Sequence, residues 1–161
     1  MPDKAREGHG DGERHDERHP HGHDEGRARD VVSPALAAFL STVMPAVVGT
    51  VRKDGTPQLN PVWYEYRDGL IWLNPTESRA WGKRCRPGAR ITLLFVDPKD
   101  MFHWAQVQGI VVERTMNGGE EHIDRLAHRY LGTNYPGHDP RDPRFVVTVR
   151  PTRVTGFHEQ G

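Results

Sequence analysis

The sequence predicts a mainly β (α+β) fold, in which an antiparallel sheet curls into a small barrel with a few flanking helices. Two Asp-Gly pairs, Asp54-Gly55 and Asp68-Gly69, lie between apolar and β-branched runs, which is a strong signal for β-hairpins. Residues 97–100 form a further turn between two strand-like runs. Five or more strands linked mostly by tight turns form an antiparallel sheet, and closing the sheet into a barrel removes its exposed edges.

The expected elements follow from turn and capping residues along the chain. Ser33 before Pro34 is an N-cap and first-turn pair, so a short helix is expected there. A basic helix is expected at residues 77–86, and a third helix begins at Asn117, where Glu120 completes a capping-box-like start. Strands are expected at residues 46–52, 57–66, 70–74, 89–96, 101–115, 145–149 and 154–157.

The chain divides into a polar tail and one domain. Residues 1–30 contain nine acidic residues, six basic residues and five histidines, but only three apolar residues. A segment this polar cannot offset its loss of conformational entropy by burial, so residues 1–30 are expected to be disordered. Residues 31–161 are long enough for one domain with its own hydrophobic core.

Charge and hydropathy exclude several classes of protein. Residues 31–161 carry sixteen basic and thirteen acidic residues, an excess too small for a nucleic-acid-binding domain. No apolar stretch approaches the roughly 20 residues of a membrane helix, and the N-terminus lacks the apolar core of a signal peptide, so a cytoplasmic protein is expected. Cys85 is the single cysteine, and the histidine-rich run at residues 19–24 is interpreted as adventitious, so no metal site is expected.

Clustered positive charge follows the strand expected at residues 70–74. Arg79, Lys83 and Arg86 recur at helical spacing, so on a helix they would share one face. Three cations near a helix N-terminus suit an anion, and a cofactor phosphate is the best candidate. A solvated charged helix face is the alternative that composition alone leaves open.

A proline lies inside the strand expected at residues 57–66. Pro61 cannot donate a ladder hydrogen bond, so this stretch is expected at a sheet edge or a bulge. The free backbone groups of an edge strand can contact the polar rim of a flat heterocycle, although an ordinary edge strand is the simpler interpretation. Aromatic residues such as Trp63, Trp72 and Trp81 crowd the same part of the chain, either as core or as walls of a planar ligand pocket.

Three groups of residues resemble motifs of a known superfamily. They are residues 54–58 with Pro61-Val62-Trp63, then Glu77-Ser78-Arg79-Ala80, then residues 122–137. In this order they resemble the split β-barrel superfamily of pyridoxamine-phosphate oxidase and the flavin- and deazaflavin-dependent oxidoreductases, and specifically its F420-binding branch. The resemblance implies an FMN-binding split-barrel fold, a homodimer with the cofactor at its interface, and hydride transfer from reduced F420 to a small organic substrate.

The resemblance also implies which residues bind the cofactor. Ser78 and Arg79 match a Ser-Arg-Lys triplet that binds the flavin phosphate in pyridoxamine-phosphate oxidase, but Ala80 replaces the lysine. Trp81 stands where the F420-binding branch often has a lysine, so FMN stays open as the cofactor, as does a non-catalytic protein that binds F420 or haem. No catalytic residue is assigned. The expected cofactor-binding residues are Asn60, Pro61, Val62, Trp63, Asn74, Thr76, Ser78, Arg79, Lys83 and Arg84.

Overall fold

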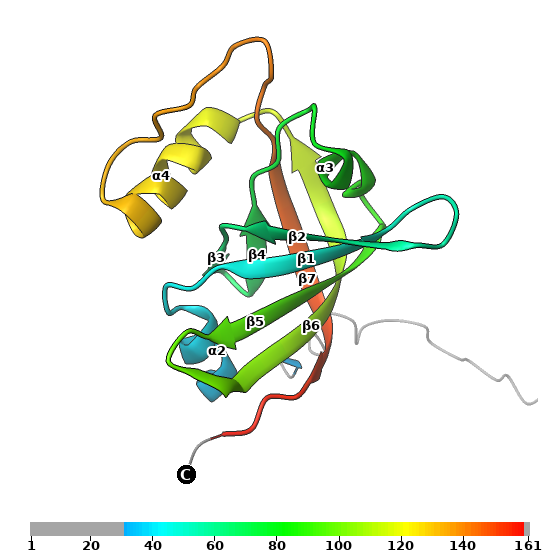
Figure 1. Cartoon of the computed structure of the whole chain (residues 1–161), viewed down its shortest axis with the longest axis vertical. Helices are drawn as coiled ribbons and strands as arrows, with labels where there is room; N and C mark the ends of the chain where they lie inside the picture. Colours follow the sequence, from blue (N-terminus) through cyan, green and yellow to red (C-terminus); the bar gives the residue numbers. More distant parts are fainter. Residues whose placement is uncertain (1–30, 160–161) are drawn as a thin grey trace, which may run out of the picture.

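The computed structural model describes residues 31–159, which form a curled antiparallel sheet with helices packed around it (Figure 1). The strands are β1 (Ala46–Val51), β2 (Pro57–Val62), β3 (Glu65–Arg67), β4 (Leu70–Leu73), β5 (Arg90–Asp97), β6 (Asp100–Thr115) and β7 (Val146–Thr155). The helices are α2 (Pro34–Leu40), α3 (Ala80–Arg84) and α4 (Gly119–Leu131). The predicted mainly β fold is confirmed. The tail predicted to be disordered, residues 1–30, lies outside the described residues.

The order of the strands shows why the sheet curls. The seven strands are hydrogen-bonded in the order β2-β1-β5-β6-β7-β4-β3, and every pair is antiparallel. β2 and β3 lie at opposite ends of this order, although only Trp63 and Tyr64 separate them in the chain. An extended chain advances about 3.5 Å per residue, so the last residue of β2 and the first of β3 lie within about 10 Å. The two edges of the sheet therefore approach each other, as in a half-open barrel.

Two strand predictions are wrong. The single strand expected at residues 57–66 breaks because Tyr64 is fully buried and its hydroxyl donates a hydrogen bond to the Leu40 carbonyl oxygen at 2.9 Å. The two strands expected on either side of Pro151 are one strand, β7. Pro151 pairs with Gly109 at a register shift of β6, and this irregularity accommodates the missing ladder donor.

Two helix boundaries also differ from the expectation. α3 is shorter than residues 77–86 because the backbone N–H groups of Glu77 and Ser78 donate to the segment before β7, to the Pro143 carbonyl and the Asp142 carboxylate. α4 begins after Gly118, whose φ of 77° is a left-handed conformation that glycine adopts without strain. The capping box expected at residue 117 therefore does not form.

The core lies on the concave face of the sheet. Alternate residues of neighbouring strands point inward, and Val48 on β1, Leu93 on β5 and Val107 on β6 are each 0% exposed. Helix α2 covers this face with Leu36 and Leu40. None of the helices in the described part of the chain is long and apolar enough to span a bilayer.

Candidate functional site

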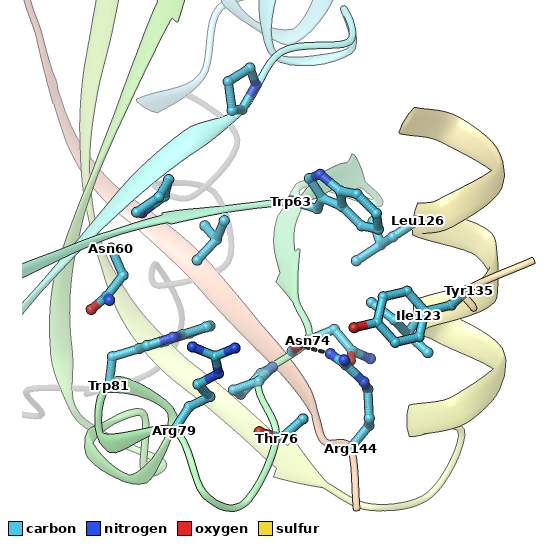
Figure 2. Close-up of a pocket in the computed structure, with 14 residues that line it drawn as sticks. Asn60, Trp63, Asn74, Thr76, Arg79, Trp81, Ile123, Leu126, Tyr135 and Arg144 are labelled. Carbon is cyan, nitrogen blue, oxygen red and sulfur yellow. Dashed lines mark hydrogen bonds between the residues drawn. The ribbon is translucent and has the colours of Figure 1, made fainter. Parts of the chain in front are cut away.

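A cavity of about 410 Å³ opens between edge strand β2, helix α4, the link from β4 to α3, and the loop from α4 to β7. It is lined by Pro45, Asn60, Pro61, Val62, Trp63, Asn74, Pro75, Thr76, Arg79, Trp81, Ile123, Leu126, Tyr135 and Arg144. Figure 2 shows Asn60 and Arg79 on one side of the cavity and Tyr135 and Arg144 on the other. A cavity of this volume is in the range that binds small-molecule ligands and cofactors.

Most of the residues expected to bind the cofactor meet at this cavity. The lining includes Asn60, Pro61, Val62, Trp63, Asn74, Thr76 and Arg79. Ser78, Lys83 and Arg84 do not line it. The structure therefore brings the expected edge strand and one expected cation together, but not the rest of the basic run.

The strand β2 presents an open edge, as predicted for Pro61. Pro57 pairs with Val51 and Pro61 pairs with Val47. Proline has no N–H, so these are the pairs that exchange no ladder hydrogen bonds, and their backbone groups face the free edge. The Pro61 carbonyl oxygen remains there as an acceptor. The side-chain oxygen of Asn60 is also buried, and it has no hydrogen-bond partner among the described residues.

An aromatic wall continues from the end of β2. The Trp63 ring stacks on Tyr130 of α4 with centroids 5.1 Å apart, and it meets Tyr135 edge-on at 6.3 Å. The Tyr130 hydroxyl donates to the Met44 carbonyl oxygen at 2.5 Å, which anchors the stack to the barrel. Trp63, Tyr135 and Ile123 line the cavity, whereas Tyr130 supports Trp63 without lining it. This side of the cavity is therefore aromatic and apolar, which suits a planar ligand.

The cations of the basic run separate because α3 is only five residues long. Arg79 lies at the N-cap of α3 in extended conformation, is exposed, and lines the cavity. Lys83 is exposed outside the cavity. Arg84 donates to the side-chain oxygen of Gln58 at 2.5 Å and to the Thr50 hydroxyl at 3.3 Å, so it ties α3 to the sheet. Arg86 lies beyond Cys85, the C-cap of α3, so the expectation that Arg79, Lys83 and Arg86 share one helix face is wrong.

Ser78 is engaged by a carboxylate of the loop before β7. Its backbone N–H donates to Asp142 at 2.8 Å and its hydroxyl donates to the other carboxylate oxygen at 2.6 Å. These hydrogen bonds hold the pKa of Asp142 below its ordinary value. The resemblance assigned Ser78 to a phosphate, but its N–H and its hydroxyl both donate to this carboxylate, so a phosphate could reach Ser78 only by displacing Asp142.

A second arginine lines the cavity at a position that sequence reasoning missed. The Arg144 guanidinium donates from Nη1 to the backbone and side-chain oxygens of Asn74, at 3.2 and 3.3 Å, and lies 4.4 Å from the centre of the Tyr135 ring. No acidic residue lines the cavity, which has two arginines. The cavity is therefore positive and suits an anionic ligand. No local pattern identifies Arg144, because a loop from a distant part of the chain brings it to the site.

The buried side chain of His122 and the backbone of α4 both contact the Asn74 amide. The Asn74 amide nitrogen donates to the Gly119 carbonyl oxygen at 2.8 Å and lies 3.2 Å from Nδ1 of His122. Nε2 of His122 lies 3.4 Å from Glu65, which also receives a two-pronged contact from Arg125. Burial would raise the pKa of Glu65, but the hydrogen bonds from His122 and Arg125 outweigh it and lower the pKa to about 2. Glu65 is therefore ionised at neutral pH.

The described residues, 31–159, contain no cluster of side chains that could hold a metal ion, where a cluster means three or more His, Cys, Asp or Glu residues. The histidine-rich run at residues 19–24 lies outside the described residues.

Comparison with solved structures shows a shared fold at low identity. An F420 reductase superposes with a TM-score of 0.65 and 23% identity, over 74% of this chain and 94% of that chain. A conserved hypothetical protein from Mycobacterium tuberculosis gives a TM-score of 0.57 and 22% identity, over 81% and 92%. An FAD- and haem-binding protein from Mycobacterium smegmatis gives 0.56 and 15%, over 81% and 75%.

Comparison with protein families covers nearly the whole domain. The sequence profile of the pyridoxamine 5'-phosphate oxidase family matches residues 32–158. This range contains every strand of the curled sheet and all the residues that line the cavity. The chain therefore belongs to the pyridoxamine 5'-phosphate oxidase family, within the split β-barrel superfamily.

Proposed function

We propose that the protein is an oxidoreductase that binds the deazaflavin F420 in this cavity and transfers hydride between the reduced cofactor and a small organic substrate. The observation that carries the proposal is the combination of an open strand edge, an aromatic wall that includes Trp63, and two arginines in one cavity without acidic residues. A tricyclic ring needs the first two features, and an anionic side chain needs the third. The F420 reductase of the same fold supports this choice of cofactor.

The buried oxygen of Asn60 tests whether a flavin-like ring fits. This oxygen is an acceptor that has no partner among the described residues. An unsatisfied buried acceptor is costly, and a ligand that donates an N–H to it removes that cost. The rim of a flavin or deazaflavin pyrimidine ring carries such an N–H between two carbonyl groups. The residues present therefore fit the ring, with Asn60 as acceptor and Trp63 as wall.

The residues of the chain would bind and orient the cofactor, which itself supplies the hydride chemistry. The aromatic wall around Trp63 holds the ring plane and excludes water from one of its faces. Arg79 attracts the phosphate from the opposite side of the cavity. The titratable side chains of the lining are those of Tyr135 and the two arginines, so we assign no acid or base.

FMN and haem are the alternative ligands of this cavity. FMN is the runner-up, since it has a similar ring and one phosphate for Arg79. Haem is less suited because the cavity lining has no His, Cys or Met side chain that could ligate its iron. Trp81 stands at the cavity wall, where the F420-binding branch often has a lysine. A flat indole in place of a flexible ammonium favours a ligand that is held by stacking over one that is held by charge alone.

We further propose that the protein acts in the cytoplasm as a homodimer. The convex face of β1 and β2 presents Val51 and Leu59, which are 63% and 67% exposed. Leu59 precedes the lining residue Asn60 on β2, so a second copy seated on this face would lie next to the strand that lines the cavity. Sedimentation of the purified protein with and without cofactor measures this association, and a monomer at micromolar concentration in both states would contradict it.

Titration of the purified protein with F420, FMN and haem, followed by absorbance and fluorescence, tests the proposed cofactor. We expect micromolar or tighter binding of F420 and weaker binding of FMN. Mixing the complex of reduced F420 with candidate acceptors should then return the absorbance of the oxidised deazaflavin. Tight binding of FMN or haem alone would replace the proposal, and binding of F420 without any oxidation by acceptors would indicate a carrier.

A further inference from the structure

A chain of buried polar contacts ends at the second arginine of the cavity; its Glu65–His122 link is an ion-pair contact at 3.4 Å, and its other links are hydrogen bonds. It runs from Glu65 to His122, then to Asn74, and then to Arg144. The side chain of His122 is 2% exposed, and Asn74 is 8% exposed. Figure 2 shows the last link, where Arg144 reaches Asn74 beneath the Tyr135 ring. Such a chain restricts Arg144 to one orientation at the cavity wall.

The hydrogen-bond directions in this chain follow from its two fixed ends. The Gly119 carbonyl oxygen needs a donor, so the Asn74 nitrogen must face it, and the Asn74 oxygen then faces Arg144. The second hydrogen of the Asn74 nitrogen points at Nδ1 of His122, which must accept. The His122 proton therefore lies on Nε2, where it faces the ionised Glu65 carboxylate at 3.4 Å. Each member has one consistent role, so the chain forms a single arrangement.

Arg144 keeps donors for a ligand. Its hydrogen bonds to Asn74 use Nη1, which leaves Nε and Nη2. Asp142 is near enough for Arg144 to lower its pKa, but both of its oxygens accept hydrogen bonds from Ser78. A guanidinium with donors in a fixed fork, beside a cavity without acidic residues, recognises a planar oxyanion.

We propose that Arg144 is a second anion-binding group of the cavity, and that Glu65, His122 and Asn74 are positioning residues that hold it. It binds a carboxylate or phosphate distinct from the group at Arg79, because the two arginines lie on opposite sides of the cavity (Figure 2). The identity of the ligand rests on the proposed function, whereas the existence of an anion site at Arg144 does not depend on it. The anion belongs either to the side chain of the cofactor or to the substrate.

The anion site is tested first without any cofactor. The protein is titrated with benzoate and with inorganic phosphate, and the Nε–H signals of its arginines are followed by NMR, with Arg144→Gln to assign the signal. We expect a saturable shift of the Arg144 signal with at least one of the two anions. Its absence with both would overturn the proposal. The readout needs no cofactor, so it decides the role of Arg144 even if F420 and FMN fail to bind and the proposed function falls.

The source of the anion is tested with cofactors that differ in charge. F420 carries a phosphodiester and glutamate carboxylates, FMN carries one phosphate, and riboflavin carries neither. If the anion is in the cofactor, Arg144→Gln should weaken F420 about tenfold while riboflavin binding stays unchanged. If it is in the substrate, Arg144→Gln should leave F420 affinity unchanged but weaken benzoate binding to the loaded protein about tenfold. The control is Arg141→Gln, which removes a 90% exposed cation of the same loop. An equal effect of both substitutions would overturn the proposal.

The positioning role is tested at His122. His122→Leu removes both of its contacts and should weaken benzoate or F420 binding as much as Arg144→Gln does, with no further loss in the double variant. His122→Gln, which retains one acceptor and one donor, should restore most of the affinity. Should His122→Leu fail to fold, Asn74→Asp places a carboxylate beside Arg144 and should abolish anion binding by neutralising it. Wild-type affinity in His122→Leu, or in Asn74→Asp, would overturn the positioning role.

Discussion

Arg79→Gln is the most direct perturbation of the proposed phosphate contact. Arg79 is exposed, it lines the cavity, and its side chain does not cap α3. Its backbone contacts, to the Thr76 carbonyl and from the Lys83 N–H, do not depend on the side chain. The substitution should therefore leave the melting temperature nearly unchanged and alter only the interaction with a ligand.

The expected loss follows from the exposure of this contact. A hydrogen bond to a charged group contributes roughly 1.5–3 kcal/mol, and an exposed guanidinium should fall near the lower limit because water and salt screen it. A loss of about 1.5 kcal/mol corresponds to about a tenfold weaker affinity. Raising the ionic strength should weaken binding to the wild type more than to the variant, since the variant has one charge fewer to screen.

The assay is a fluorescence titration of F420 and FMN at two salt concentrations. Lys83→Gln is the matched control, because Lys83 is an exposed cation on the same helix that does not line the cavity. We expect Lys83→Gln to change affinity less than about twofold, in the manner of a distant surface charge. Equal affinities of the wild type and Arg79→Gln for both cofactors would refute the phosphate contact. Equal losses of affinity in Arg79→Gln and Lys83→Gln would show that only the overall positive charge of this surface matters.

Three further substitutions test the cavity and the buried network. Val62→Trp should fill the cavity beside β2 and abolish F420 binding in the same titration, while the fold stays intact. A methyl group at Gly82 would clash with the Pro75 ring, so Gly82→Ala should lower the free energy of unfolding by about 1–3 kcal/mol in urea. Folding lowers the pKa of Glu65 from 4.5 to about 2, so its contribution to stability is complete above pH 4.5 and is lost as the pH falls toward 2. Unfolding of Glu65→Gln should therefore depend less on pH in that window, and parallel pH profiles would contradict this.

The sheet could be predicted from sequence because its turns are specified locally. Asp54-Gly55 and Asp68-Gly69 lie at the β1–β2 and β3–β4 turns, and Asp68 and both glycines have positive φ. The break between β2 and β3 could not be predicted in this way. It depends on the burial of Tyr64 against Leu40, a contact between residues 24 apart in the sequence. Tertiary packing overrode a continuous strand pattern there.

Some residues of the candidate site could likewise be predicted from local sequence signals, and others could not. Residues 60–63 and Arg79 were identified because edge prolines and clustered cations are local signals. Arg144 and Tyr135 were missed because they reach the cavity on a loop whose path depends on distant contacts. Ser78 was included on motif grounds, but its partner Asp142 lies 64 residues away in the sequence. A motif identifies a residue type at a position, and only the fold shows which group occupies its donors.

The two sides of the cavity are held by different kinds of interaction. The β2 side is held by a backbone ladder to β1, whereas the opposite side depends on side-chain contacts of α4. Asp124 of α4 accepts from the Tyr135 N–H at 2.8 Å, and His138 lies 2.8 Å from the same carboxylate oxygen, so the loop is fastened to the helix. Breaking a few side-chain contacts costs less free energy than breaking a sheet ladder. We therefore expect α4 and its loop, not β2, to move when a ligand enters. Substitutions on α4 and its loop can then change ligand recognition while the barrel stays intact.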